Sequence, residues 1–271
     1  MVVMRETWRP HPLAWIHRAE ARGIARELGA QLVSAEAVPP GSLLRLSDPV
    51  MREVVRTIRI PYFGPGSAAL ERCYDKYEAC RRIAGAPRTF LASETHSLPA
   101  PFVLKPRRGS DSLGVRLVGD VPPRKRDEHH LVQERIVGEE VTVALFRERV
   151  GMPLRILLPP GTPYSFLRKY LWRPAREVLR DEAIRDAALG VGRALGVDWA
   201  ARVDFIVRDG RANFLECDAA PLVGLGSAFA ASFAAAGVER ATQLAWLTSV
   251  SSGRPPSDPA AAHGQNRLSN C

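Results

Sequence analysis

Residues 202–218 read RVDFIVRDGRANFLECD, two runs in which apolar and charged residues mix, joined through Asp209-Gly210. Runs of this kind on either side of an Asp-Gly pair predict a β-hairpin. We expect its strands over residues 201–207 and 212–216. Side chains alternate between the two faces of a strand, so the charged residues spaced two apart on each strand share a face. This hairpin is the segment on which the fold and its chemistry depend.

The length of the turn decides whether the charged residues of both strands lie on the same face. A two-residue turn places Asp204 on the face opposite Glu216 and Asp218. A three-residue loop sets Asp204 across from Glu216 and Arg202 across from Asp218. The second arrangement gathers three carboxylates, the kind of oxygen ligand that Mg²⁺ takes; the alternative is a solvated face with surface ion pairs. We expect the three-residue loop and a metal site formed by Asp204, Glu216 and Asp218.

A small-residue loop, Gly109-Ser-Asp-Ser-Leu-Gly114, follows the predicted strand Phe102-Val-Leu-Lys-Pro106. Small residues let backbone N–H groups approach phosphate closely, and Lys105 can reach the same phosphates as a point charge. Another strand, not a helix, follows the loop, so it is neither a P-loop nor a dinucleotide fingerprint. Taken alone, an ordinary turn is the alternative interpretation.

Lysine is rare in this chain: of 38 basic residues only four are lysine, namely Lys76, Lys105, Lys125 and Lys169. A lysine retained among so many arginines indicates a position where a compact ammonium is wanted instead of a planar fork. Lys125 lies in a charged loop. The other three are candidates for binding phosphate.

The net charge of +9 over 271 residues raises the question of nucleic acid, but the basic residues are scattered. The one dense cluster, residues 124–126, is followed at once by Asp127-Glu128, so we expect no nucleic-acid partner. The longest apolar stretch, residues 228–238, is too short and too interrupted to span a bilayer. The N-terminus has no apolar signal-peptide core, and the four cysteines form no CxxC pair. We therefore expect a cytoplasmic protein without a membrane partner.

The chain divides into parts with mixed helical and strand patterns, which predicts an α/β (α+β) fold. We expect a long helix over residues 67–84, carrying Lys76, and another over residues 177–195. The Ser-, Gly- and Pro-rich end of the chain cannot bury enough apolar surface to order itself. The four expected parts are a short N-terminal α/β lobe, a central lobe with the small-residue loop, a C-terminal lobe with the metal site and a disordered tail: residues 1–64, 65–150, 151–250 and 251–271.

These motifs, in this order, resemble those of the ATP-grasp superfamily and, within it, the D-alanine–D-alanine ligases. The resemblance runs from about residue 60 to residue 250. Besides the hairpin and the small-residue loop, four segments carry it: Ile60-Pro-Tyr-Phe-Gly-Pro-Gly66, Asp75-Lys76, Gln133-Glu-Arg-Ile-Val-Gly-Glu-Glu140 and Arg168-Lys-Tyr170. It implies an ATP-grasp architecture of three lobes.

The resemblance also implies an activity: an ATP-dependent carboxylate–amine ligase that forms an amide, such as a dipeptide, through an acyl phosphate and releases ADP and phosphate. It implies ATP and two Mg²⁺ ions as cofactors, with Mn²⁺ as a substitute, amino-acid-like substrates and a homodimer. The implied catalytic residues are Arg202, Lys169, Tyr170 and Ser112. The implied ATP-binding residues are Lys76, Lys105, Ser110, Asp111, Gln133, Glu134, Ile136, Glu140 and Lys169.

One further implied contact is that of Ser227 with the carboxylate of the second substrate; the alternative for this serine is a helix cap. The sequence departs from the family where the first substrate is held. The N-terminal lobe lacks the glycine-rich loop and the His-Gly motif, Asp111 replaces a serine, Asp218 replaces an asparagine, and Leu222 replaces the glycine after Pro221. The identity and chirality of the substrates, and intermolecular against intramolecular closure, stay open. The alternative function is an ATP-grasp nucleotide-binding module with altered catalysis.

Overall fold

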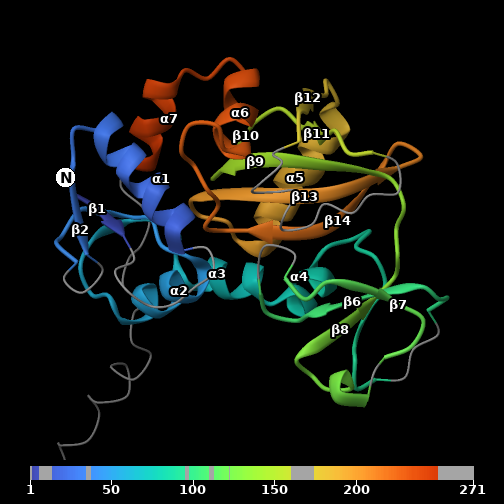
Figure 1. Cartoon of the computed structure of the whole chain (residues 1–271). Helices are drawn as coiled ribbons and strands as arrows, with labels where there is room; N and C mark the ends of the chain where they lie inside the picture. The colour runs from blue at the N-terminus through green and yellow to red at the C-terminus, as the bar shows by residue number, and fades with distance from the viewer. Residues whose placement is uncertain are drawn as a thin grey trace, which may run out of the picture.

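Figure 1 shows the computed structural model of the chain, and it describes residues 2–5, 14–34, 38–94, 98–109, 113–121, 123–159 and 174–249. Three β-sheets and the helices packed on them organise these residues. The α/β (α+β) class expected from the sequence is confirmed. None of the helices in the described ranges is long and apolar enough to cross a membrane.

The N-terminal unit is a four-stranded parallel sheet with the strand order β2-β1-β3-β4. Helix α1 follows β1, and α2, which the sequence patterns did not reveal, lies between β3 and β4. The elements of this unit are β1 (Val2–Arg5), α1 (Ala14–Glu27), β2 (Gln31–Ser34), β3 (Ser42–Leu44), α2 (Asp48–Thr57) and β4 (Tyr62–Phe63).

A second four-stranded sheet, antiparallel throughout, has the order β5-β8-β6-β7. It lies at the end of the molecule away from the N-terminal unit (Figure 1). Its strands are β5 (Thr89–Leu91), β6 (Phe102–Pro106), β7 (Arg116–Val118) and β8 (His130–Gln133), and the 3-10 turn η1 (Pro123–Lys125) joins the last two.

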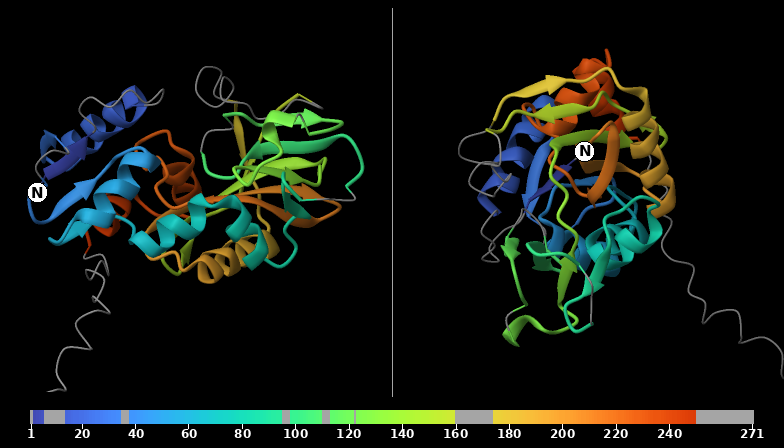
Figure 2. Two further views of the ribbon diagram at one scale, coloured as in Figure 1. Left: turned by 90° about the horizontal axis from the view of Figure 1, so that it is seen from below. Right: turned by 90° about the vertical axis from the view of Figure 1, so that its right-hand side faces the viewer.

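The largest sheet adjoins both of these units (Figures 1 and 2) and has the order β12-β11-β9-β13-β14, with β10 paired to β9. All of its pairings are antiparallel. Its strands are β9 (Glu139–Phe146), β10 (Arg149–Val150), β11 (Leu154–Ile156), β12 (Arg176–Val178), β13 (Ala200–Arg208) and β14 (Arg211–Asp218).

The two faces of this sheet are covered differently. Helices α3, α4 and α5 pack on the face that carries Val143, Val203 and Phe205. On the other face, α6 and α7 join the sheet to the N-terminal unit through a core that includes Phe146 and Trp199. The five helices are α3 (Ser67–Tyr74), α4 (Lys76–Arg82), α5 (Glu182–Leu195), α6 (Ala228–Ala235) and α7 (Arg240–Leu247). The rest of this second face borders the cavity described below.

The single helix expected over residues 67–84 is wrong, since α3 and α4 are separated by Asp75, whose backbone is extended. The Asp75 carboxylate caps α4 by accepting from the Glu78 N–H at 3.2 Å. It also accepts from Arg107 at 2.9 Å and Arg108 at 3.0 Å. The chain turns at Asp75 because this side chain is bound to the strand end that precedes the small-residue loop, and the turn brings Lys76 next to that loop.

The helix expected over residues 177–195 is also wrong in its first turn. It begins at Glu182, after Asp181 caps it by accepting from the Ile184 N–H at 3.1 Å. Glu177 lies instead in strand β12, opposite Arg155 of β11. The three residues of β12 are too few for their hydrophobic pattern to distinguish a strand from the first turn of a helix.

Candidate active site

The hairpin that decides the fold has a two-residue turn, so the expected three-residue loop is wrong. Arg208 pairs with Arg211. Asp209 and Gly210 between them have φ angles of 52° and 70°. Positive φ at both central residues is what a type I′ hairpin turn requires, and Asp-Gly is among the pairs that supply it.

A β-bulge then corrects the register within the strands. Phe205 pairs with Phe214, whereas the preceding residue, Asp204, pairs with Glu216. Leu215 is the extra residue of β14, and one extra residue reverses the face of every side chain beyond it. The bulge therefore brings about the alignment that the sequence argument attributed to the loop.

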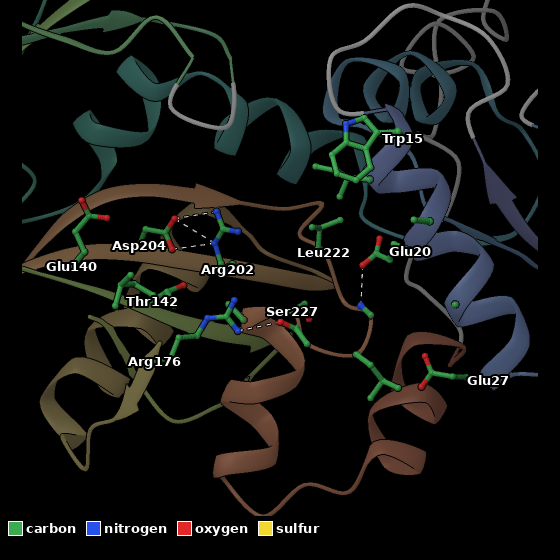
Figure 3. Close-up of a pocket in the computed structure, with 18 of the residues that line it drawn as sticks. Trp15, Glu20, Glu27, Glu140, Thr142, Arg176, Arg202, Asp204, Leu222 and Ser227 are labelled. Atoms are coloured by element: carbon green, nitrogen blue, oxygen red, sulfur yellow. Dashed lines mark hydrogen bonds and ion pairs between the residues drawn. The ribbon is translucent and has the colours of Figure 1, made fainter. Parts of the chain in front are cut away.

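Arg202 lies at the centre of the resulting polar cluster. It pairs across the ladder with Asp218, as Asp204 does with Glu216. One guanidinium nitrogen, Nη2, lies 3.0 Å from Asp204 Oδ2, 3.9 Å from Glu216 Oε1 and 3.8 Å from Asp218 Oδ2. Figure 3 shows the paired Arg202 and Asp204 side chains on the sheet face. The four residues that the sequence placed on one face are thus together.

The charge balance of the cluster raises the pKa of Arg202 well above its ordinary value. Burial alone would lower that pKa, but the negative charges of Asp204, Asp218 and Glu216 outweigh it. Arg202 is therefore a fixed cation.

Lys76 approaches the same cluster from the start of α4. Its ammonium lies 4.0 Å from Glu216 Oε2 and donates to the carbonyl of Gly109, the first residue of the small-residue loop. The side chain is almost fully buried. Lys76 therefore links the carboxylate cluster of one sheet to the loop of the other.

Lys105 lies nearby on β6 and is also buried. Burial lowers the pKa of its ammonium, Lys76 lowers it further, and the influence of Cys80 and Glu216 opposes the shift. The structure thus gathers two of the three candidate lysines beside the loop. The third, Lys169, lies outside the described residues.

The donor set fits a divalent cation in chemistry and charge. Asp204, Glu216 and Asp218 contribute three negative charges, against two positive charges from Arg202 and Lys76. Hard cations such as Mg²⁺ take carboxylate oxygens and tolerate few protein ligands when phosphates supply the rest. Within the part of the chain that the structure describes, no three His, Cys, Asp or Glu side chains already have the arrangement of a metal site. The guanidinium of Arg202 is the cation now in contact with the carboxylates.

Two cavities meet at this cluster. A large one of about 690 Å³ borders Arg202 and Asp204 and extends to α1. A small one of about 50 Å³ borders Arg202 on its other side, with Lys76, Gly109 and Glu216. Arg202 lines both, so it lies where a ligand in the large cavity meets the lysine-bearing loop.

The large cavity contains a second arginine that the sequence motifs did not indicate. Arg176 of β12 donates to the carbonyl of Gly226 at 3.1 Å, beside Ser227 (Figure 3). Ser227 caps α6, accepting from the Ala230 N–H at 3.1 Å, as the alternative interpretation expects, and it also borders the cavity.

Thr142 on β9 also borders this cavity. Thr142 pairs with Asp204, and its side chain is 5% exposed with no hydrogen-bond partner. Neither Thr142 nor Arg176 belongs to a motif, so only the strand order reveals them.

The helix α1 forms the far wall of the cavity and is held in place by a buried ion pair. Glu20 accepts from Arg45 at 2.8 Å, and Arg45 is fully buried. The other carboxylate oxygen of Glu20 accepts from the backbone N–H groups of Val223 and Gly224. This network joins the N-terminal unit to the loop between β14 and α6.

The remaining candidates lie on β8, on β9, in the segment between these strands or outside the described residues. Gln133 is buried and donates to Thr89 at 2.8 Å, while Glu134 pairs with Arg88 at 3.1 Å. Ile136 lies in the segment between β8 and β9, and Glu140 on β9 borders the large cavity. The candidates outside the described residues are Ser110, Asp111, Ser112, Lys169 and Tyr170.

Comparison with known proteins shows which proteins this chain resembles. Residues 73–158 match the ATP-grasp domain family. The D-alanine–D-alanine ligase of Syntrophotalea carbinolica is 30% identical over 201 residues, which cover 64% of this chain and 65% of that enzyme. The D-alanine–D-alanine ligase of Thermotoga petrophila is 28% identical over 221 residues, 71% of each chain. The matched region thus spans about two thirds of the length of these relatives.

Solved structures agree in fold. The D-alanine–D-alanine ligase from Bacillus anthracis complexed with ATP superposes with a TM-score of 0.71 at 19% identity, covering 91% of this chain and 94% of that one. The D-Ala:D-Ser ligase from Enterococcus faecalis gives 0.62 at 22% identity, covering 76% and 71%. At such identities the likeness establishes the fold alone. The ATP-grasp resemblance expected from the sequence is confirmed.

Proposed function

The chain resembles the ATP-grasp D-alanine–D-alanine ligases, and from that premise we propose that it is an ATP-dependent carboxylate–amine ligase. The observation that carries the proposal is the position of Arg202. It lies between the large cavity, which suits organic substrates, and the small one beside Lys76. A carboxylate in the first and a phosphate in the second would meet there.

The reaction has two steps. An oxygen of the substrate carboxylate bonds to the γ-phosphorus of ATP, and the bond to the leaving ADP breaks. The nitrogen of the amine substrate then bonds to the acyl carbon, phosphate leaves, and the amine loses a proton. The product is an amide.

The residues described above supply charge and position, which are most of what phosphoryl transfer asks of a protein. Lys76 and Lys105 neutralise phosphate oxygens. Arg202 stabilises the oxyanion that forms when the amine attacks. Asp204, Glu216 and Asp218 would hold Mg²⁺, which supplies charge neutralisation at the phosphates.

The finer assignments are proposals of the same kind. We assign adenine and ribose binding to Gln133, Glu134, Ile136 and Glu140, and a substrate carboxylate to Ser227. The proposal also includes two Mg²⁺ ions, which Mn²⁺ can replace, and amino-acid-like substrates. It further includes a homodimer, a cytoplasmic location and a division into lobes at residues 64 and 150.

The test uses hydroxylamine in place of the amine. Incubated with Mg·ATP and a pool of D- and L-amino acids, the protein should release ADP and form a hydroxamate, because hydroxylamine captures an acyl phosphate. Arg202→Ala should lower the rate about a hundredfold or more. Arg155→Ala, on the opposite face of the same sheet, should leave it unchanged. ATP binding without ADP release or hydroxamate would contradict the proposal and leave a nucleotide-binding module.

A further inference from the structure

The large cavity has two chemically different ends. At the sheet end lie the charged side chains of Arg176, Arg202 and Asp204. At the other end lie α1 and the loop between β14 and α6. Figure 3 shows Trp15 at this end, apart from Asp204 and Glu140, with Leu222 between Trp15 and Arg202. A ligand that spans the cavity therefore meets charge at one end and a different surface at the other.

The acidic side chains at the α1 end are already neutralised within the protein. Glu20 binds Arg45 at 2.8 Å and two backbone N–H groups. Glu27 binds Arg240, with its two oxygens at 2.7 and 2.9 Å from the guanidinium. These carboxylates hold the wall together, and neither offers an unbalanced charge to a substrate ammonium.

The apolar side chains at this end are exposed to an unusual degree. Leu225, at 70% exposure, is the most exposed large apolar residue in the described ranges, and Trp15 is 57% exposed. Both border the same cavity. Large apolar groups that gather in one exposed place mark binding sites more often than isolated ones do.

Space is available beside these side chains. Ala19 and Gly23 follow Trp15 on the cavity face of α1 at intervals of four residues, as one helical stripe requires. A Cβ atom added at Gly23 would meet nothing within 4 Å. We call this part of the cavity, lined by Trp15, Ala19, Gly23, Leu222 and Leu225, the recess. The charged side chain of Arg26 on α1 borders the same cavity.

We propose that this recess binds the bulky apolar side chain of an amino-acid substrate, aromatic or branched aliphatic, whose polar end lies at Arg202. The inference rests on the proposed ligase function and narrows its substrate class. An alanine-sized methyl group would leave the recess open to water, whereas a leucine or phenylalanine side chain would cover Trp15 and Leu225.

Calorimetric titration tests the recess without requiring turnover. The full chain, with Mg²⁺ and a non-hydrolysable ATP analogue, is titrated with the D and L forms of leucine, phenylalanine and alanine. For one of the two enantiomers, the dissociation constant of leucine or phenylalanine should be lower than that of alanine by about tenfold or more. Equal or tighter binding of alanine, or no binding of any bulky amino acid, would overturn the inference.

Two variants localise the effect. Gly23→Leu fills the recess and should remove the preference for bulky side chains while leaving alanine affinity within about twofold. Leu225→Ala should weaken leucine binding several-fold, whereas Leu117→Ala, at a 52% exposed position on β7, should not. Unchanged leucine binding in both recess variants would place the side chain elsewhere and overturn the proposal.

Turnover separates this inference from the function on which it rests. Absence of ADP release with every amino-acid pair contradicts the ligase proposal, and the titrations still decide the recess. ADP release at a higher kcat/KM with alanine pairs than with leucine or phenylalanine pairs supports the ligase and contradicts the recess.

Discussion

The two walls of the large cavity are built by opposite means. The sheet wall takes its charges from one hairpin, so residues two apart along a strand lie together through local geometry. The α1 wall joins residues about two hundred positions apart, and Glu20 ties it to Val223 and Gly224. The charged cluster therefore depends on one hairpin, whereas the α1 wall depends on contacts between segments far apart in the sequence.

The largest expected effect is on the α1 wall. Glu20→Ala leaves the charge of fully buried Arg45 unpaired and removes the acceptor of two backbone N–H groups. Breaking a buried pair in this way should lower the free energy of unfolding by about 3–5 kcal/mol, measured by urea denaturation. Glu148→Ala removes a pair with Arg193 that is more than half exposed, and should cost less than about 1 kcal/mol. Equal losses would show that Glu20 does not hold the wall.

On the sheet wall, we expect a loss of rate with little loss of stability. Glu216→Gln keeps the shape of the side chain but removes one of the three carboxylates. ADP release should fall about a hundredfold, the scale of damage to a metal site, while the midpoint of thermal unfolding changes by a few degrees. The control is Glu177→Gln, which breaks an exposed pair with Arg155. Full activity of the Glu216→Gln variant would contradict the proposal that this cluster binds a metal ion.

The pH dependence of ATP binding tests Lys105. Because burial lowers the pKa of this ammonium below its ordinary 10.5, the charge is lost at a lower pH than usual as the pH rises. The KM for ATP should therefore increase in alkaline solution, by up to about tenfold, and Lys105→Arg should flatten that increase because arginine stays protonated. Lys125→Arg, in the exposed charged loop, provides the matched control. If the KM for ATP increased equally at alkaline pH in Lys105→Arg, a group other than Lys105 would cause the increase.

The smallest effect compares one substitution at two helices. Gly23→Ala in α1 and Gly190→Ala in α5 each meet nothing within 4 Å. Each should raise the free energy of unfolding by about 0.4–1 kcal/mol through helix propensity and the unfolded state. Only Gly23→Ala should also alter leucine affinity, since Gly190 borders neither described cavity. A change in affinity from Gly190→Ala would contradict the assignment of the recess to α1.

Local patterns in the sequence were sufficient to predict many of the charged residues of the sheet wall. Alternation along β13 and β14 placed Arg202, Asp204, Glu216 and Asp218 together, and the scarcity of lysine singled out Lys76 and Lys105. The sequence argument attributed this alignment to a three-residue loop, whereas the structure has a two-residue turn and a bulge. The prediction of a shared face was still correct, because one extra residue in a strand and one extra residue in the loop have the same effect on which face each side chain occupies.

The remainder depends on contacts that no local pattern contains. Asp75 breaks a helix because it binds Arg107 and Arg108, more than thirty residues later in the chain. Thr142 and Arg176 enter the site only through the strand order of the large sheet. The apolar wall of α1 becomes a recess only when the loop after β14 lies against it.

The most direct test of the account follows one oxygen atom. A substrate carboxylate labelled with heavy oxygen is incubated with the protein, Mg·ATP and an amine substrate, and the released phosphate is analysed by mass spectrometry. Formation of an acyl phosphate predicts that each phosphate released carries one labelled oxygen from the carboxylate. Amide formation with unlabelled phosphate, or ATP hydrolysis that leaves the label entirely in the carboxylate, would contradict the account.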